Sequence, residues 1–162
     1  MSTSNVLFTE QQIQERVKEC ATWIDNVASN DYVLCPILQG SYQFASDLSN
    51  YLVSKPILDF CGTQRYVDGL AEDLYIYKGF DMFYLSNKVV VLLDVIINTG
   101  TTMDSMCKLA AQAGASKVYT ATLLHRKFAA KKPSWVGFTI SDEVVDGYGM
   151  GAHRTMKSIC YE

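Results

Sequence analysis

Apolar residues recur along the first part of the chain with two different spacings. Between residues 13 and 27 they stand three or four positions apart, which predicts an amphipathic helix of about five turns. Thr9 and Gln12 precede that stripe in the spacing of a capping box, which would begin the helix. Residues 32–38 are nearly all apolar and predict a buried strand, with Pro36 near its end because proline has no amide to donate.

The same two patterns alternate through the rest of the chain. A turn at 39–41 leads to a helix with Leu48 and Leu52 on one side, and another helix is expected at 101–113, before Gly114. Strands are expected at 57–61, 74–77, 88–97, 118–124 and 135–140. Segments with neither pattern are expected to be a polar loop at 62–73 and an irregular segment at 141–157.

Strands that alternate with helices predict an α/β fold, in which a mostly parallel, twisted sheet is flanked by helices on both faces. The chain has 162 residues, of which 49% are hydrophobic, and it shows no linker, repeat or low-complexity stretch. This size suits a single domain over residues 1–162 with one hydrophobic core. Ligands of such sheets bind at the carboxyl ends of the strands, so we expect the functional site there.

Charge and cysteine content exclude several functions. The formal charge is −3 and the basic residues are scattered, which argues against a nucleic-acid-binding surface. The five cysteines have wide spacings and no Cys-x-x-Cys pair, so neither a zinc site nor a disulfide framework is expected. No signal-peptide pattern and no apolar run of membrane-spanning length is present. We therefore expect a cytoplasmic protein without a membrane partner.

Residues 89–103, VVVLLDVIINTGTTM, join a buried strand to a turn of small polar residues. Asp94 is the one acid in this stretch, and the turn itself consists of Thr99, Gly100, Thr101 and Thr102. The turn stands at an expected helix start, where the first amides have no partner within the helix. Glycine lets the backbone approach a ligand and the threonine hydroxyls add donors, so the turn predicts a phosphate-binding loop. A plain threonine-rich helix start is the alternative, and the glycine patterns of Walker and dinucleotide loops are absent.

Three stretches carry a family resemblance. LLDVIINTGTTM resembles the phosphoribosyl diphosphate (PRPP) signature of the type I phosphoribosyltransferases. ILQGSYQFASDL, at 37–48, and WVGFTISDEVVDGYGMG, at 135–151, are similar to segments of the hypoxanthine-guanine phosphoribosyltransferases. The three stretches follow the family's order over nearly the whole chain. A phosphate-binding α/β domain of another family would require the 135–151 match to be accidental.

The resemblance implies the type I phosphoribosyltransferase fold, with a core at about 30–140 and a small irregular hood formed by about 141–162 together with the N-terminal region. It also implies an enzyme that transfers ribose 5-phosphate from PRPP to a 6-oxopurine base and releases pyrophosphate. Such an enzyme needs Mg²⁺ on the pyrophosphate and is expected to be a homodimer or homotetramer. PRPP and a nucleobase or nucleotide are then its partners.

The resemblance also gives roles to individual residues. Thr99, Gly100, Thr101 and Thr102 match the loop that binds the 5-phosphate. Asp94 matches an acid that holds the ribose hydroxyls directly or through Mg²⁺. Gln39 and Gly40 match the turn that meets the pyrophosphate, which has a cis peptide bond in many relatives. Lys157 matches a basic residue near the pyrophosphate, and Arg154 is a neighbouring candidate. Arg65 and Tyr66 fall in the lid. In the base pocket, Arg126 matches a donor to the 6-oxo group and Val145 a residue whose backbone reads the purine edge.

Four positions depart from the family's pattern. Val95 replaces a second strand-end acid, and Gly151 replaces an aspartate that helps to hold a second Mg²⁺. Asn98 replaces the catalytic acid that takes a proton from the purine, and an amide cannot act as a base near neutral pH. Val144 replaces the aromatic residue that stacks on the base. The alternative to an active enzyme is therefore a weakened or regulatory homologue that binds PRPP or a nucleotide without efficient turnover.

Overall fold

Parallel strands form the centre of the main sheet in the computed structural model, which describes residues 5–68 and 71–162. They are β2 (Tyr32–Leu38), β6 (Val89–Ile97), β7 (Lys117–Arg126) and β8 (Trp135–Ile140). The described strands follow the order β5-β4-β2-β6-β7-β8, and the short β3 (Ile57–Leu58) also pairs with β2. The expected α/β fold with a mostly parallel sheet is confirmed.

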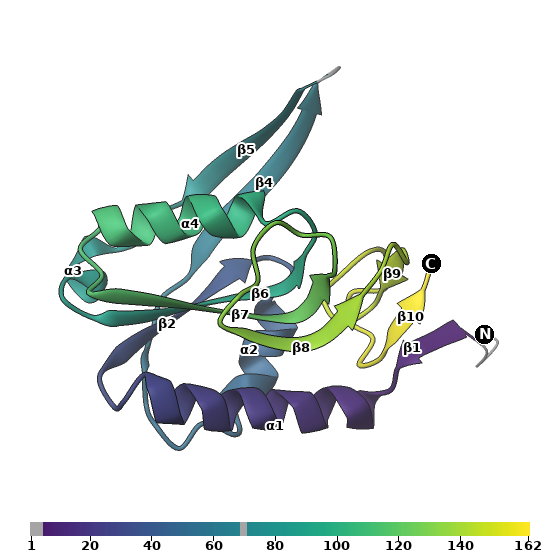
Figure 1. Cartoon of the computed structure of the whole chain (residues 1–162), viewed down its shortest axis with the longest axis horizontal. Coiled ribbons are helices and arrows are strands. Elements are labelled where there is room, and N and C mark those ends of the chain that lie inside the picture. The colour runs from purple at the N-terminus through teal and green to yellow at the C-terminus, as the bar shows by residue number, and fades with distance from the viewer. Residues whose placement is uncertain (1–4, 69–70) are drawn as a thin grey trace.

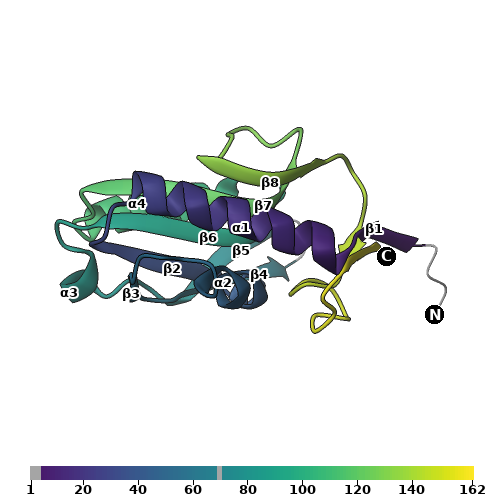
Figure 2. The same ribbon diagram turned by 90° about the horizontal axis from the view of Figure 1, so that it is seen from below.

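Helices cover both faces of this sheet (Figures 1 and 2). One face carries α1 (Glu10–Val27) and α2 (Tyr42–Ser49), and the other carries α4 (Thr101–Gln112) and the short α3 (Met82–Leu85). Alternate residues of β6 enter two different hydrophobic clusters: Val91 and Leu93 pack on the α1 side, whereas Val90 and Leu92 pack on the α4 side. A strand buried on both faces must be apolar at every position, which explains the uninterrupted run in the sequence.

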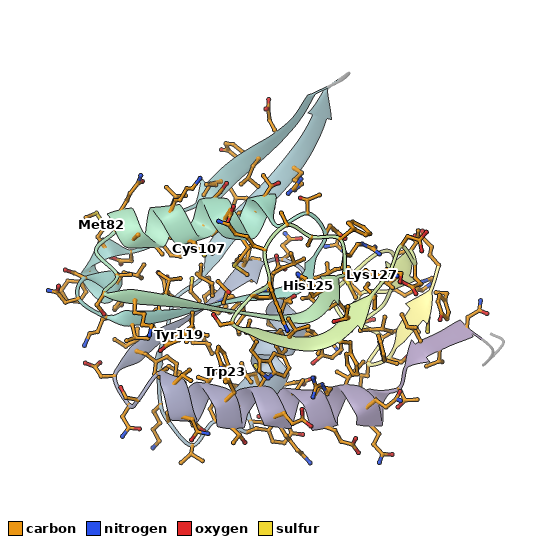
Figure 3. All side chains as sticks on the ribbon, viewed as in Figure 1. Trp23, Met82, Cys107, Tyr119, His125 and Lys127 are labelled. Atoms are coloured by element: carbon orange, nitrogen blue, oxygen red, sulfur yellow. The ribbon has the colours of Figure 1, made fainter. Side chains whose placement is uncertain are left out.

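The first helix begins where the sequence predicts. The Thr9 hydroxyl accepts a hydrogen bond from the Gln12 amide, and the Gln12 side chain accepts one from the Thr9 amide at 2.9 Å. The capping box is therefore confirmed. Further along α1, Trp23 meets Tyr119 of β7 edge to face, with 5.9 Å between ring centroids, and so joins the helix to the sheet (Figure 3).

The expected loop at 62–73 is wrong. The chain there forms an antiparallel hairpin of β4 (Cys61–Asp68) and β5 (Ala71–Lys78), which projects from the body of the protein (Figure 1). Pairs such as Thr63 with Ile76 and Arg65 with Leu74 form its ladder. Most of the described side chains at 64–65 and 73–78 are exposed, and the polar sequence at 62–68 lacks the apolar alternation of a half-buried strand. The expected strand at 74–77 is confirmed as part of β5.

The expected strand at 57–61 is interrupted. β3 ends at Leu58 and β4 begins at Cys61, because the Asp59 carboxylate turns the chain. Asp59 accepts hydrogen bonds from the Phe60 amide at 2.8 Å and from the Asp81 amide at 3.1 Å. Pro36 lies near the end of β2, two residues before Leu38, as expected. It stands beside the gap between the β3 and β4 ladders, where hydrogen bonding on that side is already interrupted.

A second, small sheet joins the two ends of the chain. It contains β1 (Val6–Phe8), β10 (Ile159–Tyr161) and β9 (Val145–Asp146), in that order and all antiparallel. The sequence predicts none of these short strands, and most of the segment expected to be irregular does lack regular structure. Among the described residues, no helix combines the length and the apolar character that a membrane crossing needs.

Candidate active site

A cavity of about 380 Å³ opens at the carboxyl end of the sheet, next to the start of α4. Apolar residues of β2 and β6 line it, together with Met150, which follows β9. Its other lining residues include Gly40, Thr63, Arg65, Asp94, Asn98, Thr99, Gly100 and Thr102. Residues from four separate stretches of the sequence thus meet around a space of the size that small ligands occupy.

The threonine loop lies open to this cavity. Gly100 has a φ of 96°, and a Cβ atom added there would meet nothing within 4 Å, so a ligand can approach the backbone closely. Thr99 and Thr102 line the cavity, whereas Thr101 lines a neighbouring depression. The hydroxyls of Thr99 and Thr101 are 3.0 Å apart. Helix α4 begins here, so its unpaired amides add donors that favour an anion.

Asp94 lies where β6 leaves the core and reaches the cavity. Its Oδ1 atom accepts a hydrogen bond from the Val95 amide at 2.7 Å. Burial raises the pKa of the Asp94 carboxyl to about 7, against the lowering effect of the Val95 and Ile96 amides and of the Arg65 charge. Near neutral pH this carboxyl is therefore ready to gain charge when a cation or a hydroxyl donor arrives.

Arg65 brings the hairpin to the threonine loop. Its Nη2 and Nε atoms lie 2.9 and 3.3 Å from Thr102 Oγ1, to which both donate. No other cationic residue lines this cavity in the part of the chain that the structure describes. The guanidinium thus adds positive charge beside the loop whose amides already favour an anion.

A second cavity, of about 350 Å³, adjoins the first on the other side of the turn after β2. Gln39, Gly40 and Arg154 line it, and Arg154 Nη1 donates to Gln39 Oε1 at 3.4 Å. The peptide bond between Leu38 and Gln39 is cis. Lys157 lines neither cavity: its side chain is 71% exposed and lies 3.6 Å from Glu10 of α1. Of the two basic residues, only Arg154 is therefore close to the turn.

Asn98 and Arg126 form a side-chain pair. Arg126 Nε donates to Asn98 Oδ1 at 2.7 Å, and Arg126 Nη1 donates to the carbonyls of Ser141 and Glu143 at 2.8 and 2.9 Å. Arg126 therefore ties the end of β7 to the loop after β8 and to the end of β6.

Neither Val144 nor Val145 is among the residues that line the cavity. Val145 is buried in β9, opposite Tyr161, and Val144 is exposed. The backbone of Tyr66 belongs to β4, and its side chain lies outside what the structure describes.

Comparison with known proteins gives the family. The sequence model of the phosphoribosyl transferase domain matches residues 5–153. The chain belongs to the phosphoribosyltransferase family. A hypoxanthine-guanine phosphoribosyltransferase of Staphylococcus epidermidis is 30% identical over 97% of this chain and 90% of its own length. The family resemblance, and with it a phosphoribosyltransferase enzyme, is confirmed.

Solved structures of relatives agree with this family assignment. A hypoxanthine-guanine phosphoribosyltransferase of Bacillus anthracis superposes with a TM-score of 0.87 at 26% identity, covering 99% of this chain and 98% of that one. A hypoxanthine phosphoribosyltransferase of Staphylococcus aureus superposes with a TM-score of 0.86 at 29% identity, covering 98% of this chain and 90% of that one. The expected type I phosphoribosyltransferase fold is confirmed.

Two departures from the phosphoribosyltransferase pattern change the packing of the site. Val95, at the position of the second acid, is buried, and its Cγ1 atom lies 3.2 Å from the position of a Cβ atom added to Gly40. At Gly151 a Cβ atom would lie 2.4 Å from Asp146 Oδ1. Asp146 contacts the His153 imidazole and accepts from the amides of Gly147 and His153, both at 2.9 Å. The Asp146 carboxylate thus occupies the space beside Gly151 and holds the hood loop.

The acidic residues of this phosphoribosyltransferase fit a metal ion that binds together with its substrate better than one that the protein holds permanently. The described residues contain no group of three or more His, Cys, Asp or Glu side chains close enough to hold a metal. Asp94 is the single carboxylate among the residues that line the main cavity. Mg²⁺ is commonly bound by one or two carboxylates together with substrate phosphates and water, and one carboxylate fits that role.

Sequence reasoning missed several lining residues. Thr63 belongs to the segment expected to be a loop, so nothing marked it as part of a site. Met150 lies within the recognised 135–151 stretch, but an apolar residue there carries no signal of chemistry. The contact between Arg65 and Thr102 joins residues 37 positions apart, and no local pattern predicts it.

Proposed function

We propose that this enzyme transfers the ribose 5-phosphate of PRPP to a 6-oxopurine base and releases pyrophosphate, as the names of its relatives indicate for them. The observation that carries the proposal is the single cavity lined by the threonine loop, Asp94 and Asn98. A phosphate anchor, an acid for the ribose hydroxyls and a polar group for the base lie in succession along one strand end. Nucleotide salvage is the corresponding role.

The proposed reaction forms a bond between a ring nitrogen of the base and C1′ of the ribose. The bond from C1′ to pyrophosphate breaks, and its electron pair leaves with the pyrophosphate. Thr99, Gly100, Thr101 and Thr102 hold the 5-phosphate, so that C1′ is fixed beside Asp94. Asp94 holds the ribose hydroxyls, and its negative charge stabilises the positive charge that develops on the sugar.

Pyrophosphate would lie in the adjoining cavity, over Gln39 and Gly40. The Arg154 guanidinium there supplies a positive charge and a fork of donors that matches phosphate oxygens. Mg²⁺ bound to the pyrophosphate and approached by Asp94 would neutralise charge on the leaving group. Arg65 and Tyr66 on the hairpin act as the lid that covers the reacting bond and excludes water. We place the base beside Asn98 and Arg126, with Val144 and Val145 at the edge of the pocket.

A panel of free bases tests this function. The enzyme is mixed with PRPP, Mg²⁺ and hypoxanthine, guanine, xanthine, adenine or uracil, and the release of pyrophosphate is followed. Release with at least one 6-oxopurine and none with adenine is expected, because Arg126 can donate to an oxo group but cannot accept from an amino group. Uracil, which has oxo groups but no five-membered ring, serves as the pyrimidine control. Binding of PRPP without release for any base would favour the regulatory homologue instead.

Arg154 and Lys157 provide a matched pair of variants. Arg154→Ala is expected to weaken pyrophosphate binding about tenfold, the effect of removing one charged hydrogen bond. Lys157→Ala, which removes an exposed cation paired with Glu10, is expected to change it less than about twofold. Inhibition by pyrophosphate, measured for both variants, checks this order. A larger effect at Lys157 would return the pyrophosphate role to that residue.

Two further properties belong to the proposal. The five cysteines are unpaired thiols, as a reducing cytoplasm would keep them. A homodimer or homotetramer would cover exposed apolar side chains such as Met82 and Phe83 of α3, which are 64% and 87% exposed. Light scattering of the purified protein measures its mass in solution and tests the assembly.

A further inference from the structure

The contact with Arg126 fixes the orientation of the Asn98 amide. Arg126 Nε, at 2.7 Å, can only donate, so the amide oxygen must face it and the amide nitrogen must point away. Asn98 is exposed and lines the main cavity. Its Nδ2 atom makes no hydrogen bond to any residue that the structure describes. Asn98 therefore presents an N–H donor, and not an acceptor, to the cavity.

The charge around this donor is positive. The hydrogen-bond partners of Arg126 are the amide oxygen of Asn98 and the carbonyls of Ser141 and Glu143, all of them neutral atoms. Arg126 takes part in no ion pair within the described part of the chain. An aspartate at position 98 would neutralise the guanidinium, but asparagine leaves its charge uncompensated. Arg126 does not line the main cavity itself, but its charge lies directly behind the Asn98 amide that does. This part of the cavity thus offers a donor and positive charge, and both favour a ligand that is rich in acceptors.

We propose that Asn98 and Arg126 make this pocket selective for a base that presents a bare ring nitrogen to Asn98, which for a free 6-oxopurine means its anion. The proposal rests on the function proposed above. A neutral oxopurine carries one proton on its two five-membered-ring nitrogens. The nitrogen that attacks C1′ must carry no proton, so the proton sits on the other nitrogen. There its N–H group would face the N–H group of Asn98, and two donors cannot form a hydrogen bond. An anion formed by loss of that five-membered-ring proton has both nitrogens bare and avoids this clash.

The anion also balances the reaction. One lone pair forms the bond to C1′, and pyrophosphate leaves with the electrons of the broken bond. No proton needs an acceptor in the site. A neutral base would first have to lose its ring proton to water. Acidic bases, such as xanthine with its second electron-withdrawing carbonyl, are therefore the preferred substrate class, ahead of hypoxanthine.

Rates measured at one pH give the first test. The ratio of kcat/KM for xanthine to that for hypoxanthine is expected to exceed one in the natural enzyme. In Asn98→Asp the carboxylate can accept the ring proton, so hypoxanthine turnover should rise and the ratio should fall at least about tenfold. Comparing the ratio between variants cancels any effect of the extra xanthine oxygen that is unrelated to position 98. An unchanged ratio in Asn98→Asp would overturn the proposal.

A binding experiment tests the donor directly and needs no turnover. Guanosine 5′-monophosphate has a bare N7 atom, and its 7-deaza analogue has a C–H group at that place. Calorimetry is expected to show the analogue binding about 3- to 10-fold more weakly to the natural enzyme, the worth of one neutral hydrogen bond. In Asn98→Asp the carboxylate repels the N7 lone pair, so the analogue should bind at least as tightly as the natural nucleotide.

The matched control is Asn87→Asp, which adds the same charge at an exposed turn remote from the cavity and should keep the preference of the natural enzyme. Equal affinity of the two nucleotides for the natural enzyme would overturn the role of Asn98 and leave the proposed transferase function standing. If neither nucleotide binds, the proposed function fails and this inference fails with it.

Discussion

Replacement of both Thr99 and Thr102 by valine is expected to lower the affinity for a nucleoside 5′-monophosphate by about 100-fold or more. Each hydroxyl would donate to a doubly charged phosphate, and a hydrogen bond to a charged group contributes about 1.5–3 kcal/mol. Two such bonds amount to at least about 3 kcal/mol, which is a factor of more than 100. Valine keeps the shape of threonine, so the loop around Gly100 should keep its conformation.

Calorimetry with a nucleotide and with its nucleoside separates this effect from a general loss of binding. The nucleoside lacks the phosphate, so its affinity should change less than about twofold. Thr101→Val should cause a smaller loss than the double variant, because Thr101 lines the neighbouring depression rather than the main cavity. Unchanged nucleotide affinity in the double variant would remove the threonine loop from the site, and the proposed function would lose its anchor.

The sequence predicts best what burial controls. β6 lies between two layers of helices, so each of its faces must be apolar, and the uninterrupted run at 89–93 follows directly. The loop from Thr99 to Thr102 comes immediately after that strand. The position of a strand end in a parallel sheet thus also predicts the position of a phosphate-binding loop.

Contacts between segments that are distant in the sequence could not be predicted from the pattern of apolar residues. The sequence predicts a strand in part of β5, at 74–77, but none in β4 after Cys61, because the side chains at 64 and 65 are exposed and leave no apolar pattern. The pair of Asn98 and Arg126 spans 28 positions, and the sequence alone gives each residue a role without showing that one orients the other. Gly151 reads as a lost metal ligand until the structure shows the Asp146 carboxylate beside it. Long-range side-chain geometry, which no periodicity encodes, decides each of these cases.

Asp94→Asn is expected to stabilise the protein while removing most of its activity. The pKa of Asp94 is raised by burial from its ordinary value of 3.8 to about 7. The folded state therefore prefers the protonated acid. The stability gained in this way is complete below pH 3.8 and is lost as the pH rises through about 7, above which the folded state carries an ionised, partly buried carboxylate. Asparagine has no charge to bury, so the stability of the variant should lack this dependence.

Thermal unfolding at two pH values, without Mg²⁺ or substrate, tests whether Asp94→Asn stabilises the protein and whether the gain depends on pH. At pH 8 the variant should melt about 2–4 °C above the natural protein, which corresponds to about 1 kcal/mol in a chain of this size. At pH 5 the difference should fall to less than half of that, because only the interval between pH 3.8 and pH 5 contributes to it there. Asp31→Asn, at an exposed position remote from the cavity, should show no such pH-dependent difference. A gain of the same size at both pH values would mean that the titration of Asp94 is not its cause.

Activity should move in the opposite direction. Among the described residues, Asp94 is the one carboxylate that lines the cavity, and Val95 and Gly151 stand where the family resemblance implies two further acids. Its loss leaves no lining carboxylate to hold the ribose hydroxyls or to stabilise the charge that develops at C1′. Removal of a preorganised electrostatic group of this kind typically lowers kcat about 10²–10³-fold. A phosphoribosyltransferase that keeps several acids would retain part of that effect, whereas no other described residue that lines this cavity carries a carboxylate. We therefore expect pyrophosphate release by Asp94→Asn to fall by about 10²–10³-fold for every base, while its affinity for nucleotide phosphate at Thr99 and Thr102 stays within about twofold.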